Sequence, residues 1–375
     1  MRRGVPEDKN SRTLAARRRR AFKAAKESQG RLEAMLVTAG PDVRWLTGFG
    51  GDDSFVLFTA SKGVLITDGR FGEQAKNECP GLEIHVRTGP MSDAVAGVAK
   101  RLGVRKLGIQ AEAMTVQAAD VLKRKLGSAP LRVVNAVGPL RAVKDDVEVA
   151  AIVKAAKAAQ GAFKSLLEMG RDWWIGKTEN HIGAELDYRM RLAGAEKPAF
   201  ETIVAVGAHA SLPHYRPGST RVRADGIVLI DWGAMVGGYC SDLTRVVFTG
   251  RIPPKIGEIH QVVLLAQEAG IKSCRAGAKP AAVDQAARDV IEKAGYGKQF
   301  IHSLGHGLGL EVHESPALSK SSDKPLKSGM VVTIEPGIYL PGVGGVRIED
   351  DVLVQAGGCR ILTSLPKTPA AMTLR

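Results

Sequence analysis

The second half of this 375-residue chain contains a weak internal repeat, which restricts the folds open to it. Gly176 and Gly277 each precede a helical stretch, and both stretches end at an Ala-Gly pair, at the same offset of 101 residues. Further on, LIDWG (229–233) matches TIEPG (333–337), because each ends an apolar run on an acid two residues before a glycine. A chance match between common glycines and alanines is the alternative. Several landmarks in one order favour a duplicated fold with two similar halves around one axis.

Four acidic residues stand beside apolar runs in the two copies. Asp231 and Asp242 come from the first copy, and Glu335 and Glu349 come from the second. An ionised carboxylate among buried apolar residues is costly unless it is paired, and four carboxylates around one axis raise one another's pKa values. Divalent cations remove that repulsion, and carboxylate oxygens with a nitrogen ligand suit manganese, iron, cobalt or zinc. The sequence therefore predicts a site for one or two such ions.

Four histidines accompany the acids: His214, His302, His306 and His313. The last three lie in HSLGHGLGLEVHE (302–314), where the glycines let the backbone pass close to a site. His306 lies between the two halves of the acid set, and a single imidazole among carboxylates is typical of sites with two metal ions. The alternative is a turn with a structural histidine. The number of histidines favours a site.

The acids and His306 lie in the motifs IDWGA, YCSDLTR, GHGLGLEVHE, IEPGIY and GVRIED. Together these motifs resemble those of the pita-bread metallopeptidases, a family that includes methionine aminopeptidase, aminopeptidase P, prolidase and the non-metal relative creatinase. The resemblance covers residues 140–375 and extends into the first half. There, AMLVTAGPDVRWLTGFGGDDSFVLF and LITDGRF are similar to the N-terminal domain of creatinase, prolidase and aminopeptidase P. Methionine aminopeptidases lack that domain.

The resemblance implies an α+β protein with two domains. Residues 1–138 would form a creatinase- and prolidase-like α/β domain, and the strand patterns AMLVT, FVLFT, GVLIT and LEIHV alternate there with helical patterns. Residues 139–375 would form the pita-bread catalytic domain, a duplicated, pseudo-twofold curved antiparallel sheet with helices. The Ala- and Lys-rich segment 140–168 predicts a long helix at its start.

The resemblance also implies a set of metal ligands: Asp231, Asp242, His306, Glu335 and Glu349. Asp242 and Glu349 would bridge two divalent ions. Asp231 would bind one of these ions, and His306 and Glu335 would bind the other. Manganese is the expected metal, with cobalt, zinc or iron(II) as alternatives.

Five residues would act on the substrate or hold the site in place: His214, His313, Glu335, Tyr339 and Arg347. A hydroxide held between the two ions would attack the carbonyl of the first peptide bond, and Glu335 would accept and pass on its proton. His214 and His313 would stabilise the tetrahedral intermediate or shuttle protons. Tyr339 and Arg347 would orient Asp231 and the bridging water.

The extra N-terminal domain favours an exopeptidase that cleaves the bond before a proline at the second position of a peptide. Some prolidases carry an arginine shortly after the VHE motif to hold the dipeptide carboxylate, whereas this chain reads SPALSK (315–320). The sequence therefore favours an aminopeptidase P type enzyme, with a prolidase that cleaves Xaa-Pro dipeptides as the alternative. A non-catalytic pita-bread binding protein is disfavoured, because all five ligand positions hold a ligand residue.

The chain carries a formal net charge of +14, and residues 1–30 hold ten Lys and Arg against three acids. Such a segment can bind nucleic acid, but a charge run is more often a solvated helix face, so we expect no nucleic-acid partner. No apolar run of about 18 residues is present, so we expect no membrane partner. Scattered cysteines and a charged N-terminus predict a cytoplasmic protein, and the resemblance implies a homodimer.

Overall fold

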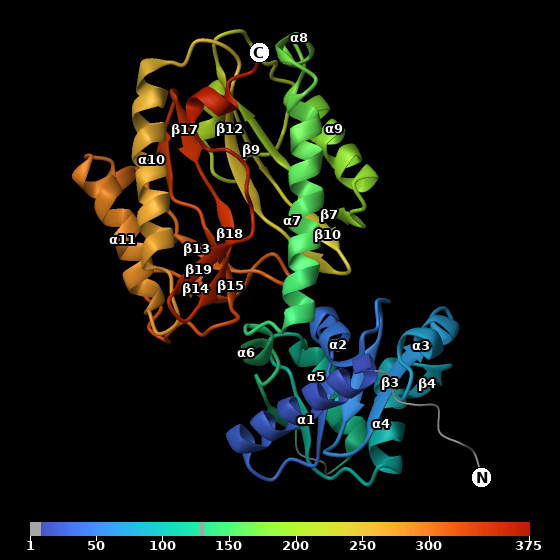
Figure 1. The fold of residues 1–375 in the computed structure, drawn as a ribbon. Helices are drawn as coiled ribbons and strands as arrows, with labels where there is room; N and C mark the ends of the chain where they lie inside the picture. The colour runs from blue at the N-terminus through green and yellow to red at the C-terminus, as the bar shows by residue number, and fades with distance from the viewer. Residues whose placement is uncertain (1–8, 128–130) are drawn as a thin grey trace. The chain divides into compact units, whose positions relative to one another are not determined.

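The computed structural model describes residues 9–127 and 131–375 and separates into two compact units, Met1–Arg141 and Ala142–Arg375 (Figure 1). The boundary expected from the sequence lies slightly earlier, after residue 138. The start of the basic N-terminal segment, residues 1–8, lies outside the described residues. None of the helices in the described ranges combines the length and the apolar character that a membrane span requires.

The N-terminal unit is built on a six-stranded sheet with the strand order β4-β3-β2-β1-β5-β6. Its strands are β1 (Ala34–Val37), β2 (Phe55–Phe58), β3 (Gly63–Asp68), β4 (Glu83–Arg87), β5 (Leu107–Ile109) and β6 (Leu131–Val133). Its helices are α1 (Lys9–Gln29), α2 (Gly40–Thr47), α3 (Gly72–Glu78), α4 (Met91–Arg101), α5 (Val116–Leu126) and α6 (Gly138–Arg141). The β3–β4 and β5–β6 pairs are parallel, and α3 and α5 provide the crossover connections that parallel neighbours require.

Two pairs of helices flank the strands of the C-terminal unit, α7 with α9 on one side and α10 with α11 on the other (Figure 1). The helices are α7 (Asp146–Leu167), α8 (Arg171–Trp174), α9 (Glu179–Leu192), α10 (Pro254–Ser273) and α11 (Pro280–Lys293). Helices α9 and α11 each have 14 residues and start 101 residues apart, as the repeat predicts. The helix expected over 140–168 begins later, because Asp145 forms a capping box with Glu148 at its start.

Each half of the repeat contributes one long antiparallel strand pair, β9 with β12 in the first half and β15 with β18 in the second. The strands of this unit are β7 (Lys197–Pro198), β8 (Ile203–Val206), β9 (Ile227–Trp232), β10 (Ala234–Val236), β11 (Tyr239–Cys240), β12 (Leu243–Phe248), β13 (Gly305–Gly307), β14 (Glu314–Leu318), β15 (Val331–Ile334), β16 (Gly337–Leu340), β17 (Gly344–Arg347), β18 (Asp350–Gln355) and β19 (Gly358–Ile361). An isolated antiparallel bridge between Thr244 and Glu349 joins the two pairs. The duplicated α+β arrangement predicted from the sequence is confirmed.

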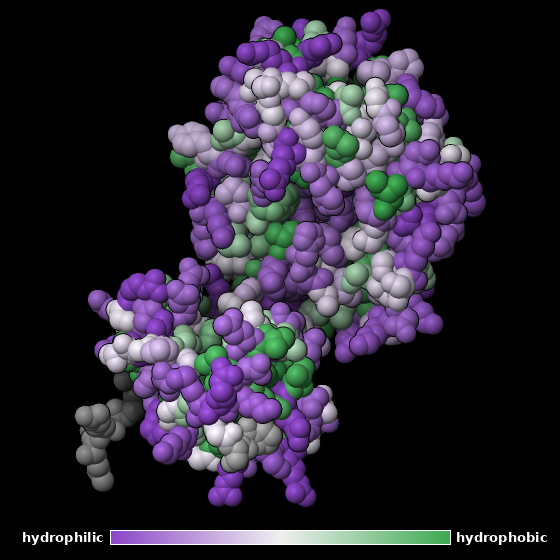
Figure 2. Space-filling view, turned by 180° about the vertical axis from the view of Figure 1, so that it is seen from behind, coloured by the Kyte–Doolittle hydropathy of each residue, from purple (hydrophilic) through white to green (hydrophobic). Residues whose placement is uncertain are grey.

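The main hydrophobic core lies between these helices and strands. Phe163 of α7 stacks on Trp232 of β9, with ring centroids 4.2 Å apart. Both residues are fully buried, and the indole N–H of Trp232 donates to the carbonyl oxygen of Ala159 at 3.1 Å. Hydrophilic side chains cover most of the face that Figure 2 displays. The contrast between this core and the surface is the usual consequence of apolar burial.

A buried ion pair connects the two halves of the repeat. Arg245 of β12 and Asp350 of β18 lie 2.7 Å apart, and their side chains are 1% and 0% exposed. Gln267 and Thr363 also donate to Asp350, at 2.8 and 2.7 Å, and Lys367 forms a further ion pair with it. Burial alone would raise the pKa of Asp350, but Arg245 and Lys367 outweigh burial and hold this pKa below its usual value.

Replacing Asp350 by alanine is expected to lower the free energy of unfolding by about 3–5 kcal/mol, because it leaves Arg245 buried without a counter-charge. Urea denaturation in the presence of a chelator measures this loss apart from any metal effect. The exposed Asp323 provides the matched control, and its replacement by alanine is expected to change stability by less than about 0.5 kcal/mol. Equal stability of the two variants would contradict a structural role for the ion pair.

Candidate active site

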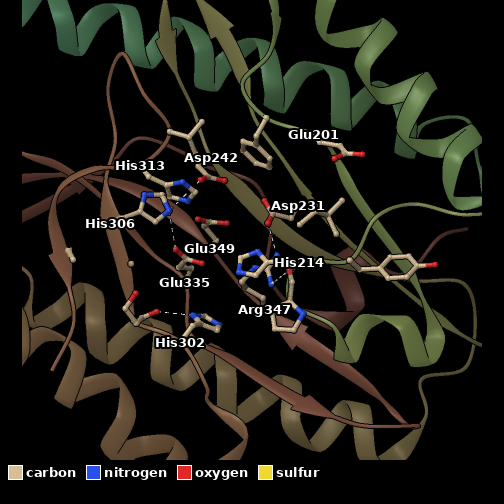
Figure 3. Close-up of a pocket in the computed structure, with 18 of the residues that line it drawn as sticks. Glu201, His214, Asp231, Asp242, His302, His306, His313, Glu335, Arg347 and Glu349 are labelled. Atoms are coloured by element: carbon tan, nitrogen blue, oxygen red, sulfur yellow. Dashed lines mark hydrogen bonds and ion pairs between the residues drawn. The ribbon is translucent and has the colours of Figure 1, made fainter. Parts of the chain in front are cut away.

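The four acids predicted from the sequence converge in the C-terminal unit (Figure 3). Asp231 lies on β9, and Asp242 immediately precedes β12. In the second half, Glu335 directly follows β15 and Glu349 directly precedes β18. Antiparallel pairing brings the end of one strand beside the start of its neighbour, and the bridge at Glu349 brings the two halves together. The duplication thus places four strand ends, each with an acid, at one position.

His306 of β13 lies beside these acids (Figure 3). Its Nε2 is 3.2 Å from Oε1 of Glu335 and 3.7 Å from Oδ2 of Asp242. Its Nδ1 lies 3.1 Å from the carbonyl oxygen of Gly307, which orients the ring with Nε2 toward the acids. One ligand atom each from Asp242, His306 and Glu349 lie within 4.8 Å of one another. This spacing allows the three side chains to bind one cation.

Burial and mutual repulsion disfavour the ionised forms of the two central acids. Burial raises the pKa of Asp242 well above its usual value, and the charges of Glu349 and Asp231 raise it further. The pKa of Glu349 is raised by burial and by Glu335 and Asp231. Burial also acts to raise the pKa of Glu335, but the hydrogen bond and charge of His306 outweigh it and lower this pKa to about 2. Ionising all four acids together is therefore costly without a cation.

The donor atoms at this site fit divalent cations. Oδ2 of Asp231 accepts a hydrogen bond from Arg347 at 2.5 Å, whereas Oδ1 is buried and has no hydrogen-bond partner among the described residues. A buried carboxylate oxygen without a donor is unfavourable, and a cation would satisfy it. Several carboxylates and one imidazole form a donor set that suits manganese, cobalt, zinc or iron(II).

Arg347 connects several of the candidate ligands. Its Nε donates to Thr244 Oγ1 at 3.0 Å, and the Thr244 hydroxyl donates in turn to Glu349 Oε2 at 2.6 Å. A further N–H of Arg347 donates to the hydroxyl of Tyr339 at 2.8 Å. Arg347 is 3% exposed and also forms the contact to Asp231, so it holds acids from both halves. Arg347 thus contacts both the hydroxyl of Tyr339 and the carboxylate of Asp231.

The acids face a cavity of about 640 Å³ that lies within the C-terminal unit. His214 and His313 line this cavity from exposed positions, and in the view of Figure 3 Glu349 lies between them. The rings of His313 and His306 lie 4.3 Å apart. His302 also lines the cavity, and its Nε2 is 2.9 Å from the hydroxyl of Tyr339. The volume is that of a site for a small ligand.

Two family models match the chain. Residues 150–356 match metallopeptidase family M24, and residues 17–143 match the creatinase/prolidase N-terminal domain. The first match alone covers more than half of the chain. The chain belongs to metallopeptidase family M24. The prediction of a metallopeptidase is confirmed.

Several relatives of this M24 protein match almost its whole length. The Xaa-Pro dipeptidase of Pyrococcus horikoshii is 36% identical over 337 residues, which cover 88% of this chain and 93% of the relative. The structure of the Xaa-Pro dipeptidase from Bacillus anthracis superposes with a TM-score of 0.90 at 37% identity and covers 97% of this chain and 100% of its own. The structure of the X-Pro aminopeptidase from Thermotoga maritima superposes with a TM-score of 0.85 at 36% identity and covers 92% of this chain and 98% of its own. These likenesses confirm the predicted fold class.

Of the residues that the sequence predicts for the M24 site, eight line the cavity: His214, Asp231, Asp242, His306, His313, Glu335, Arg347 and Glu349. Tyr339 lies one contact away. The prediction missed Asp351, whose Oδ2 accepts the backbone N–H of Asp242 at 3.1 Å, and Thr333, which donates to Glu335 at 3.1 Å. Each of these lies two residues from a predicted ligand, so strand alternation was a signal that places it on the same face.

The prediction also missed Glu179, the first residue of α9, which is fully buried. Its Oε2 accepts hydrogen bonds from the hydroxyl of Tyr215 at 2.9 Å and from the backbone N–H of Gly218 at 3.0 Å. Its Oε1 lies 2.8 Å from Nδ1 of His209. These bonds fix the segment that carries His214 into the M24 site. The local sequence around Glu179 shows only a helix start, because its partners are distant in the chain.

Removal of divalent metal is expected to lower the melting temperature of this M24 protein, because the buried acids then repel one another without compensation. Manganese at 100 times its dissociation constant is expected to stabilise the folded state by about 2.7 kcal/mol. Calorimetric melting of the protein in EDTA, and again after addition of manganese, measures the difference. An unchanged midpoint would count against a metal site.

Asp242→Asn provides the internal control for this experiment. It removes one buried charge, so its midpoint in EDTA is expected to be no lower than that of the wild type, and manganese is expected to shift it much less. Asp323→Asn changes an exposed acid and is expected to show the same rise of the melting midpoint on addition of manganese as the wild type. A full response of Asp242→Asn would exclude Asp242 as a ligand.

Proposed function

We propose that this M24 metallopeptidase hydrolyses Xaa-Pro dipeptides and that divalent cations bind at its acid cluster. One observation carries the proposal, namely that five side chains of types that can bind metal line a cavity of dipeptide size: Asp231, Asp242, His306, Glu335 and Glu349. Three of them, Asp242, His306 and Glu349, have ligand atoms within 4.8 Å of one another. Relatives named Xaa-Pro dipeptidase that align over most of the chain support the choice of a dipeptide.

This proposal places prolidase action before aminopeptidase P action, whereas the sequence favours the opposite ranking. The lack of an arginine in SPALSK (315–320) favours aminopeptidase P action on longer Xaa-Pro peptides, whereas the names of several relatives favour prolidase action. Aminopeptidase action is the second candidate, and the similarity to a structure named X-Pro aminopeptidase supports it. The homodimer and the cytoplasmic location expected from the sequence stay predictions.

Each of the five donors has a proposed place in the site. Asp242 and Glu349 lie centrally and would be shared by two ions, Asp231 would bind one of them, and His306 and Glu335 would bind the other. Manganese is the first choice of metal, followed by cobalt, zinc or iron(II). When bound, divalent cations supply Lewis acidity that polarises the scissile carbonyl and makes water a stronger nucleophile.

The side chains of this protein supply the proton transfers. The Glu335 carboxylate, held by the Thr333 hydroxyl at 3.1 Å, accepts a proton from the attacking water and delivers it to the proline nitrogen as the C–N bond breaks. His214 and His313 donate hydrogen bonds to the developing oxyanion from the two sides of the cavity. Arg347 keeps the Asp231 carboxylate in position throughout.

Substrate length tests this proposal directly. Manganese-loaded protein is expected to hydrolyse an Xaa-Pro dipeptide with a higher kcat/KM than the matched Xaa-Pro-Yaa tripeptide, and to leave Met-Ala-Yaa intact. His306→Ala is the negative control. A preference of more than about tenfold for the tripeptide, which corresponds to about 1.4 kcal/mol in the transition state, would establish aminopeptidase action instead. No cleavage of either proline peptide would refute both candidates.

His313→Ala is expected to lower kcat on an Xaa-Pro dipeptide by about 100-fold to 1,000-fold, the usual effect of removing a donor to an oxyanion. Metal content, measured by elemental analysis of the purified variant, is expected to stay at the wild-type level. His181→Ala replaces an exposed histidine of α9 outside the cavity and should retain wild-type turnover. A fall in bound metal that matches the fall in rate would make His313 a ligand.

A further inference from the structure

Two arginines line the cavity, and they differ in how firmly they are held. Arg347 is buried and already paired with Asp231, Thr244 and Tyr339. Arg216 has a side chain that is 84% exposed, and its Nε lies 3.4 Å from Oε2 of Glu201, whose side chain is 66% exposed. An ion pair between two solvated side chains contributes little to stability. The Arg216 guanidinium can therefore exchange Glu201 for another carboxylate at low cost.

The backbone that carries Arg216 is much more rigidly held than its side chain. Tyr215 and Gly218, on either side of it, both donate hydrogen bonds to Oε2 of the buried Glu179. The ring of Tyr215 also stacks on that of His209, with centroids 4.4 Å apart. The chain thus holds the Cα of Arg216 at the cavity, while its long side chain remains free to move.

A dipeptide substrate brings a requirement that a longer peptide does not. The carboxylate of an Xaa-Pro dipeptide is one residue from the scissile bond, so it enters the cavity with the substrate and loses part of its hydration there, which is costly without a counter-charge. A cation near the position of the leaving proline would therefore stabilise the bound dipeptide. Ala317, which follows the VHE motif and lines the cavity, supplies no charge.

We propose that Arg216 binds the free carboxylate of an Xaa-Pro dipeptide and releases Glu201 when it does so. This inference rests on the proposed dipeptidase function and names the residue that selects for substrate length. A guanidinium offers two parallel N–H donors to a carboxylate. Glu201 occupies the guanidinium in the free enzyme and competes with the substrate for it.

The experiment compares an Xaa-Pro dipeptide with its C-terminal amide, which has the same scissile bond and lacks the negative charge. Arg216→Ala is expected to raise KM for the dipeptide by about 10-fold to 100-fold, the effect of losing a charge-assisted hydrogen bond, with little change in kcat. KM for the amide is expected to stay the same. Arg216→Lys keeps the charge and loses the paired donors, so an intermediate KM is expected.

Two further variants sharpen the test. Glu201→Gln removes the competing carboxylate and is expected to lower KM for the dipeptide by about 2-fold to 5-fold, as for loss of an exposed pair; a rise in KM would overturn the exchange. Arg251→Ala replaces an exposed arginine outside the cavity and is expected to change KM for neither the dipeptide nor the amide.

The outcomes separate this inference from the proposed function. If the wild type cleaves the dipeptide and Arg216→Ala raises KM for dipeptide and amide equally, or for neither, the Arg216 assignment is overturned while the dipeptidase function stands. If the wild type cleaves no Xaa-Pro dipeptide, the proposed function itself fails. A rise in KM for the dipeptide alone supports both the Arg216 assignment and the dipeptidase function.

Discussion

Repulsion between buried carboxylates is the constraint around which the C-terminal unit is organised. Asp242 and Glu349 have pKa values raised well above normal by burial and by neighbouring acids. A polypeptide gains nothing in stability from such a cluster, because each acid would be better solvated elsewhere. The cluster is favourable only with a partner that carries concentrated positive charge. The donor set fits divalent cations, and the chain belongs to metallopeptidase family M24.

Positive charges of the protein itself pair with buried acids across the junction of the two halves. Arg245 of the first half pairs with Asp350 of the second, and Arg347 of the second half pairs with Asp231 of the first. These two contacts are buried and reciprocal. Each fixes a strand that carries a candidate ligand or directly follows one, so the fold holds the acids in place through contacts that do not themselves involve a metal ion.

The duplication explains how much of this could be predicted from sequence. An acid at the end of an apolar strand is a local pattern, and its recurrence at a fixed offset indicates which acids belong together. Glu179 and Arg216 could not be found in this way, because their significance depends on partners that only the tertiary fold brings near. The start of α7 was misjudged for a different reason, since Asp145 caps the helix and composition alone extends it further back.

Substrate length depends on features outside the carboxylate cluster. Structures named Xaa-Pro dipeptidase and X-Pro aminopeptidase superpose on this chain with TM-scores of 0.90 and 0.85 at 37% and 36% identity. Two names at nearly equal similarity mean that the fold alone does not determine whether a dipeptide or a longer peptide is cleaved. The discriminating group has to sense the free carboxylate that only the dipeptide places near the scissile bond. An exposed arginine on a firmly anchored segment can do so without disturbing the buried acids. It exchanges one carboxylate partner for another at the surface, where an ion pair costs little to break.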